Sequence, residues 1–216
     1  MPYWSDSGVD DGFDPSNATV GKPSPTASYL AATSVIRKNF IINGYSGVWA
    51  ADHDDGSQRW LDTENFMVWG GCKNFLGNTK TCSRNVLVFP GYANRSFGNK
   101  PCQTDDNHVY ADQSYQDNHC FTLDGRVYSM PTSSCDPKDI AQTVFRTANN
   151  SFYSANATAF VQACNTTTEL GLAEWQAKGQ DQGSRALGGM GAGEISAEVM
   201  RLGRAVLGWG FGSSRA

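Results

Sequence analysis

The segment Asp52-His53-Asp54-Asp55 places three carboxylates and an imidazole within four positions, directly after the apolar run GVWAA. Like charges this close repel one another, so the group requires a counter-charge, a metal ion, open solvent or a chemical task. Carboxylates and imidazoles are also side chains that can transfer protons. What this segment does therefore depends on the elements that hold it and on the charges they place beside it.

A recurring tetrad of Asn and apolar residues indicates those elements. It reads NFII at Asn39, NFMV at Asn65, NVLV at Asn85 and NHVY at Asn107, with Asn150 standing two periods further on. A repeat of about 22 residues with a short strand and an Asn at a turn is typical of a parallel β-helix. A β-sandwich with strands every 8–12 residues is the alternative. We favour the β-helix, because the pattern returns four times.

Counting back from each Asn aligns the polar residues between the tetrads. Twelve residues before Asn65, Asn85 and Asn107 stand, in turn, His53, Lys73 and Arg95. The residues one position earlier are Asp52, Cys72 and Asn94. The residues one position later are Asp54, Asn74 and Ser96. Coils of a β-helix stack at the ordinary strand spacing. The acidic segment is therefore expected to have cations one and two coils away, which keep the carboxylates ionised and form a polar ledge.

Composition restricts the class of protein. The 216 residues carry a net charge of −4 without a basic stripe, so nucleic acid is not an expected partner, and no apolar run is long enough to span a membrane. Six cysteines without a Cys-x-x-Cys pair favour disulfides over a zinc site. Five Asn-x-Ser/Thr sequons occur, at Asn17, Asn94, Asn149, Asn156 and Asn165. Cysteines and sequons together predict a secreted or cell-surface protein, and a cytosolic protein with free thiols is the alternative.

Fifteen disulfide pairings are open to six cysteines, and we expect the short-range set Cys72–Cys82, Cys102–Cys120 and Cys135–Cys164. Cys120 stands next to His119, but adjacent strand residues point to opposite faces. We therefore expect a disulfide at Cys120 and a hydrogen-bonded, non-ligating role for His119. The first residues, MPYWSDSGVDDGF, lack the basic end and apolar core of a signal peptide, so a secreted protein of this sequence is expected to be a fragment or to carry an incomplete gene-model start.

The C-terminal part changes character. Residues 169–184 mix apolar and polar types like a docking segment, and Ile195, Val199, Leu202 and Val206 then form one apolar helical face before a C-cap at Gly208. We predict a helix that covers the open end of the solenoid; a membrane-surface helix is the alternative, although only Arg201 and Arg204 are basic. The expected domains are an irregular segment (1–30), a β-helix (31–170) and a docking segment with a capping helix (171–216).

Two blocks carry a resemblance to a known family. ADHDDGSQRWLDTENFMVWGGCKNFLGN resembles the Asp-Asp-Gly-Ser … Gly-Gly-x-Lys block of secreted right-handed parallel β-helix proteins, which include β-xylosidase-type glycoside hydrolases. AEWQAKGQDQGS resembles the Trp-Gln-x-x-Gly-x-Asp segment that closes such domains. The resemblance covers about residues 30–185. It implies an all-β, single-stranded right-handed parallel β-helix with a nucleophile at Asp54 or Asp55, whereas Leu76 or Gly77 stands where the family's acid Glu falls.

Three functions remain open on this basis. The first is a glycoside hydrolase acting through Asp54 and Asp55, with His53 or an acid from another coil as proton donor. Its expected substrate-binding residues are Asp52, Lys73, Asn74, Arg95 and Trp69. Trp49, Trp60 and Trp69 are the candidates for stacking on sugar faces, with a structural role in the coil as the alternative for each. A lyase variant of this first function would hold Ca²⁺ on the aspartates, with Arg95 or Lys73 as the base beside a uronic acid substrate. The second is a non-catalytic glycan-binding or cell-surface module, and the third is a structural turn capped by Asp side chains. We expect a monomer with no cofactor other than this Ca²⁺, and a polysaccharide or oligosaccharide as partner.

Overall fold

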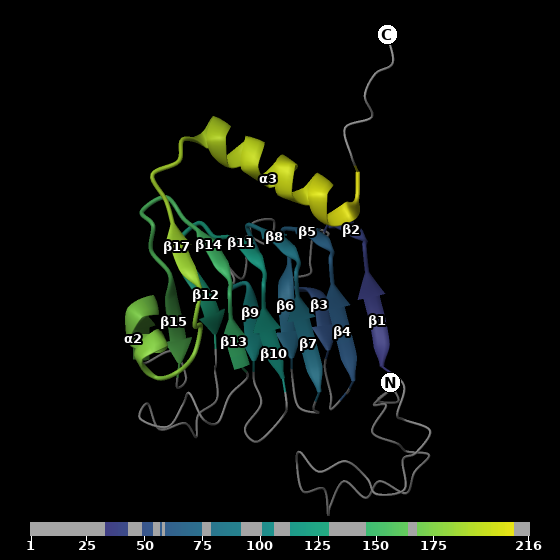
Figure 1. Ribbon diagram of the computed structural model, residues 1–216, viewed down its shortest axis with the longest axis horizontal. Coiled ribbons are helices and arrows are strands. Elements are labelled where there is room, and N and C mark those ends of the chain that lie inside the picture. The colour runs from purple at the N-terminus through teal and green to yellow at the C-terminus, as the bar shows by residue number, and fades with distance from the viewer. Residues whose placement is uncertain are drawn as a thin grey trace, which may run out of the picture.

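The chain folds into three β-sheets, as a computed structural model shows (Figure 1). The structure describes residues 33–42, 49–53, 57, 59–74, 79–91, 101–105, 113–129, 146–163 and 168–209. Nearly half of these residues lie in short strands, and the described helices are α2 (Leu172–Ala177) and α3 (Ala192–Leu207). The prediction of an all-β protein is confirmed in that the chain forms mainly parallel sheets with few helices. Neither described helix is long and apolar enough to span a membrane.

Each sheet takes every third strand of the chain, except that sheet C also contains β16, which directly follows β15. Sheet A contains β1 (Ser34–Arg37), β4 (Trp60–Thr63), β7 (Lys80–Ser83), β10 (Ser114–Gln116) and β13 (Arg146–Ala148). Sheet B contains β2 (Phe40–Ile42), β5 (Phe66–Val68), β8 (Val86–Val88), β11 (His119–Phe121), β14 (Ser151–Tyr153) and β17 (Arg185–Leu187). Sheet C contains β3 (Trp49–His53), β6 (Gly71–Asn74), β9 (Gln103–Asp105), β12 (Arg126–Ser129), β15 (Phe160–Ala163) and β16 (Thr168–Gly171). All neighbours pair in parallel except β15 and β16.

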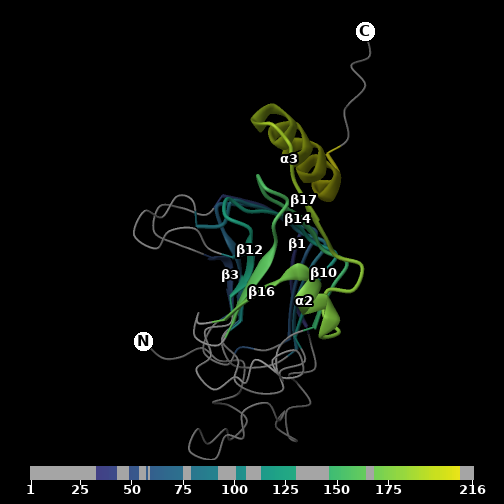
Figure 2. The same ribbon diagram turned by 90° about the vertical axis from the view of Figure 1, so that its left-hand side faces the viewer.

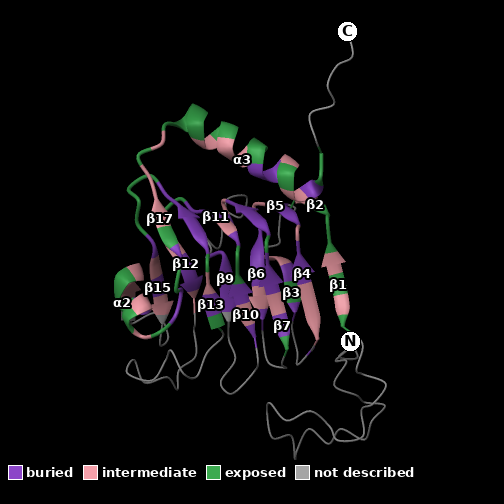
Figure 3. Ribbon diagram, in the orientation of Figure 1, coloured by how far each residue is buried: buried purple, intermediate pink, exposed green. Residues whose placement is uncertain are grey.

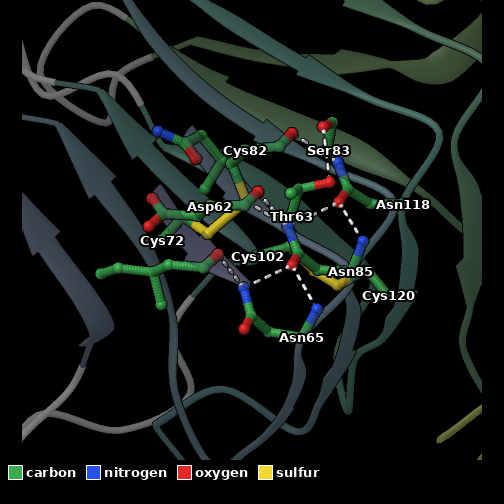
Figure 4. Close-up of a disulfide and its surroundings, with 12 residues drawn as sticks. Asp62, Thr63, Asn65, Cys72, Cys82, Ser83, Asn85, Cys102, Asn118 and Cys120 are labelled. Atoms are coloured by element: carbon green, nitrogen blue, oxygen red, sulfur yellow. Dashed lines mark hydrogen bonds between the residues drawn. A yellow bond between two sulfur atoms is a disulfide. The ribbon is translucent and has the colours of Figure 1, made fainter. Parts of the chain in front are cut away.

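Each corner between sheets A and B is formed by one residue in the left-handed region followed by one Asn. The left-handed residues have φ between 54° and 57°, at Lys38, Glu64, Arg84, Asp117 and Asn149. The Asn side chains stack as a ladder in which each backbone N–H donates to the Oδ1 of the next Asn, for example from Asn65 to Asn85 at 2.9 Å (Figure 4). Because both ends of each buried amide are bonded, hiding it from water costs little.

The ladder confirms the predicted Asn repeat at Asn39, Asn65, Asn85 and Asn150, and corrects it at one rung. Asn85 N–H donates to Asn118 Oδ1, and Asn118 N–H donates to Asn150 Oδ1, both at 2.9 Å. The rung between them is therefore Asn118, and the prediction of Asn107, which lies outside the described residues, was wrong. The tetrad NHCF at Asn118 carries the same signal, but it stands 33 residues after Asn85 and not 22.

The space between the sheets is filled by inward side chains from alternate strand positions, among them Met67, Leu87, Tyr115 and Phe152. The disulfides Cys72–Cys82 and Cys102–Cys120 lie in this core beside the ladder, as Figure 4 shows, and confirm two of the three expected pairs. The third, Cys135–Cys164, lies outside the described residues. The sheets and their shared interior are seen end-on in Figure 2.

The C-terminal end of the core is closed by β16 and α2. Trp175 on α2 is fully buried, and its indole N–H donates to Thr147 Oγ1 at 3.2 Å. The ladder ends in the same place, where Asn150 N–H donates to Ser184 Oγ and Asn150 Nδ2 donates to Asp181 Oδ1. Residues 169–184, the segment predicted to dock, thus include the strand and helix that close the described C-terminal end of the stack.

Helix α3 lies along the outer face of sheet B and not over an end of the stack, so the predicted location of the capping helix was wrong (Figures 1 and 3). Its predicted apolar face of Ile195, Val199, Leu202 and Val206 packs on Phe66, Val86, Val88, Phe121 and Tyr153. Strands such as FMV and VLV are apolar at every position, which is typical of strands buried on both faces. Gly203 lets the helix approach, since an added Cβ would lie 2.5 Å from the Phe66 ring, and Gly208 is the left-handed C-cap.

Candidate functional site on sheet C

Sheet C carries a row of polar residues on its outer face. The strand register aligns six positions, one on each strand, which we call the sheet C row: Asp52, Lys73, Thr104, Ser129, Gln162 and Glu169. Alternate residues such as Cys72, Tyr128 and Val161 are buried in the core, so the row points away from it. With strands about 4.8 Å apart, five steps give a row of about 24 Å. This length suits a chain-like ligand better than a single small molecule.

The N-terminal end of the row is covered by an indole. Lys73 Nζ forms an ion pair with Asp52 Oδ1 at 3.0 Å and lies 4.6 Å from the centre of the Trp49 ring. The Trp49 indole N–H donates to Thr104 Oγ1 at 3.3 Å, so the side chain reaches from β3 across β6 to β9. Asp52 stays 43% exposed whereas only 13% of the Lys73 side chain is exposed. The group therefore offers one carboxylate, one shielded ammonium and one aromatic surface.

The register differs by one position from the predicted alignment. Lys73 pairs with Asp52, and His53 pairs with Asn74. The connection from β3 to β4 spans residues 54–59 and the connection from β6 to β7 spans residues 75–79, so counting back from Asn65 and Asn85 meets loops of unequal length. On β9 the row continues with Thr104, where the count had placed Arg95.

His53 does not lie on the outer face, which corrects the prediction of a solvent-facing ledge at this residue. It is 5% exposed, and its Nε2 lies 2.5 Å from Asp62 Oδ2 on the neighbouring sheet A. The Trp60 ring stacks on it at 4.6 Å, and the fully buried Lys80 donates from Nζ to the His53 carbonyl at 2.9 Å. His53 is therefore part of a buried charged group that fixes the end of β3.

Sequence reasoning missed Asp62 and Lys80. Both are buried and point inward from sheet A strands. A charged residue at an inward-pointing strand position is the sequence signal that could have identified them as partners of a buried group. Buried charges persist in proteins when they are paired and hydrogen-bonded.

The remaining predicted site residues are dispersed. Asn74 is buried beside His53 in the register, and Trp69 lies after β5 in the left-handed region with φ 66°. Asp54, Asp55 and Arg95 lie outside the described residues. The structure therefore brings Asp52 and Lys73 together, adds Trp49 and Thr104 to them, and leaves Asn74 and Trp69 off the row.

His119 has the structural role that the sequence predicts. Its Nδ1 lies 3.3 Å from the Tyr153 hydroxyl on the outer face of sheet B, while Cys120 points inward to its disulfide. Burial lowers the pKa of the His119 imidazole below its ordinary value. Among the residues that the structure describes, no group of three or more His, Cys, Asp or Glu side chains is arranged to hold a metal ion.

Comparison with known proteins adds no assignment: no family model, no curated protein and no solved structure matches the chain.

Proposed function

We propose that the chain is a right-handed parallel β-helix in which each group of three consecutive strands forms one coil. Support comes from the parallel pairing of every third strand and from the Asn ladder at one corner. A right-handed path is the expected one, because connections between parallel strands of one sheet are right-handed in nearly all proteins. This is the fold that the resemblance in the sequence implies.

We propose further that the protein binds a polysaccharide or oligosaccharide along the sheet C row. The observation that carries this proposal is Trp49, whose ring lies across the row beside the Asp52–Lys73 pair and Thr104. Sugars are bound where an aromatic ring meets their C–H faces and nearby polar groups meet their hydroxyls. The row supplies both kinds of contact, and its length accommodates several sugar units.

An extracellular location fits this proposal. The two described disulfides indicate an oxidising compartment. Asn149 and Asn156, the sequon residues that the structure describes, are both exposed, as attachment of a glycan requires. We therefore propose a secreted or cell-surface glycoprotein.

The test is a binding panel of neutral and acidic oligosaccharides measured by calorimetry on the wild type, Trp49→Ala and the matched control Trp209→Ala. Trp209 is 56% exposed beyond α3, and its ring contacts Phe40 of sheet B and not the sheet C row. The proposal expects binding by the wild type and by Trp209→Ala, and a loss of at least about tenfold in Trp49→Ala. Equal affinity in all three proteins, or no binding by the wild type, would contradict it.

Glycoside hydrolysis is the second candidate, because Asp54 and Asp55 directly follow β3, whose exposed Asp52 begins the row. Mass spectrometry of the same oligosaccharides after incubation tests it. Shortened products that vanish in the Asp54→Asn, Asp55→Asn double variant would establish cleavage. Intact sugars in the presence of measured binding would leave a binding module without hydrolase activity.

A further inference from the structure

The charges of sheet C limit the kind of glycan that the row accepts. The described strands of this sheet carry two cations, Lys73 and Arg126, and two exposed carboxylates, Asp52 and Glu169. Each cation is already paired: Lys73 with Asp52 at 3.0 Å and Arg126 with Asp124 at 3.2 Å. With both cations paired, Glu169 leaves the described part of this sheet with more negative than positive charge toward a ligand.

The two ends of the row are acidic, and its middle is neutral. Asp52 and Glu169 are exposed. Between them, Ser129 and Gln162 offer only uncharged hydrogen-bonding groups, and the buried Thr104 hydroxyl already accepts from the Trp49 indole N–H. Lys73 is the row's one cation, and the Trp49 ring and the Asp52 carboxylate shield it from a ligand. A uronic acid chain would bring a carboxylate to every sugar unit and meet like charge at both ends.

We infer that the sheet C row selects neutral glycans and discriminates against uronic acid polymers, with the Asp52–Lys73 pair setting the preference. This inference rests on the proposed glycan-binding function. It also separates the hydrolase and lyase readings of the sequence, because the lyase reading assigned a uronic acid as substrate.

Pairs of oligosaccharides that differ only at C6 test the preference. Suitable pairs are cello-oligosaccharides with their C6-oxidised cellouronates, manno-oligosaccharides with oligomannuronates, and carboxyl-reduced with intact oligogalacturonates. In every pair that binds, the neutral member is expected to bind at least about tenfold more tightly at low salt. Equal or tighter binding of the uronic member would overturn the inference and leave the proposed function standing. If no member of any pair binds, the proposed function itself falls, and the inference falls with it.

A charge variant tests whether the ion pair sets the preference. Asp52→Asn removes the carboxylate that holds Lys73, so the neutral-to-uronic ratio of affinities should narrow severalfold. The matched control is Glu64→Gln, which removes one carboxylate from the Arg37 pair at the corner between sheets A and B. This control should leave the ratio unchanged. An unchanged ratio in Asp52→Asn, measured on protein with wild-type circular dichroism, would overturn the role of the pair.

Discussion

Sheets B and C take their strands from the same successive repeats of the chain, but their outer faces differ in polarity and in whether a helix covers them. The outer face of sheet B is mainly apolar, from Phe66 on β5 to Tyr153 on β14, and α3 covers it. The outer face of sheet C carries the polar sheet C row and one indole, and it keeps Asp52 and Glu169 exposed. An apolar face must be covered to contribute to stability, whereas a polar face can remain exposed and meet a ligand. The covered face of sheet B thus contributes to stability, and the exposed face of sheet C is the one for which we propose glycan binding.

The largest expected effect is on the covered face. Leu202 is 7% exposed and packs on sheet B, so Leu202→Asp loses apolar burial and buries a carboxylate without a partner. We expect the free energy of unfolding to fall by at least about 3 kcal/mol, measured by urea denaturation. Met200→Asp on the same helix, at a position 46% exposed, should change it by less than about 0.5 kcal/mol. Similar losses in the two variants would show that α3 is not held by this face.

Removing one hydrogen-bond acceptor is expected to cost more stability in the Asn ladder, at the corner between sheets A and B, than on the sheet C row. Asn85 Oδ1 accepts hydrogen bonds from Asn65 N–H and Nδ2, and Asn85→Ala leaves these buried donors unpaired. We expect a loss of about 2–3 kcal/mol in the free energy of unfolding. Thr104→Val on the sheet C row removes only the acceptor of the Trp49 indole and should cost less than about 1 kcal/mol. A larger loss in Thr104→Val than in Asn85→Ala would reverse the comparison.

Because α3 contacts sheet B closely at one glycine and not at another, Gly→Ala substitutions at the two positions should change the free energy of unfolding in opposite directions. An added Cβ at Gly203 lies 2.5 Å from the Phe66 ring, so Gly203→Ala should lower the free energy of unfolding by about 1–2 kcal/mol. At Gly193 nothing lies within 4 Å, and Gly193→Ala should raise it by about 0.5–1 kcal/mol through helix propensity. Thermal unfolding of both variants measures this, and a stabilising Gly203→Ala would contradict the packing.

The smallest effect is a pH dependence at the closed end of the core. Burial raises the pKa of the Asp181 carboxyl, against hydrogen bonds from Ser184, Asn150 and Tyr128 that lower it. The folded protein therefore holds this proton at higher pH than the unfolded chain, and the resulting stability is lost as pH rises through the folded pKa. The free energy of unfolding of the wild type should fall relative to Asp181→Asn between acidic and neutral pH. A difference that does not change with pH would contradict the assignment.

The pKa of the Glu64 carboxyl is shifted in the opposite direction to that of Asp181, so its contribution to stability should depend on pH in the opposite sense. The Arg37 hydrogen bond lowers the pKa of the Glu64 carboxyl, so its contribution to stability is present above the unfolded pKa and is lost as pH falls through the folded pKa. The difference between wild type and Glu64→Gln should therefore diminish toward acidic pH.

The Asn repeat was predictable because the ladder depends on local turn chemistry that one residue type satisfies. Asn118 was missed because the chain from Asn85 to Asn118 is longer than the preceding period. The apolar face of α3 was visible in its sequence, but its location depends on the outward side chains of five strands, which no local pattern orders. The sheet C row was predicted one position out of register, since the connections that follow β3 and β6 differ in length.

The most direct test of the division between the two sheets is a titration with a neutral oligosaccharide, followed through the indole N–H signals of the six tryptophans by NMR. The Trp49 signal is assigned with Trp49→Phe, and those of Trp175 and Trp209 with their own variants. The account predicts that the Trp49 signal shifts with saturation, while the signals of the buried Trp175 and of Trp209 beyond α3 stay in place. A shift at Trp209 with none at Trp49, or no shift at all, would contradict it.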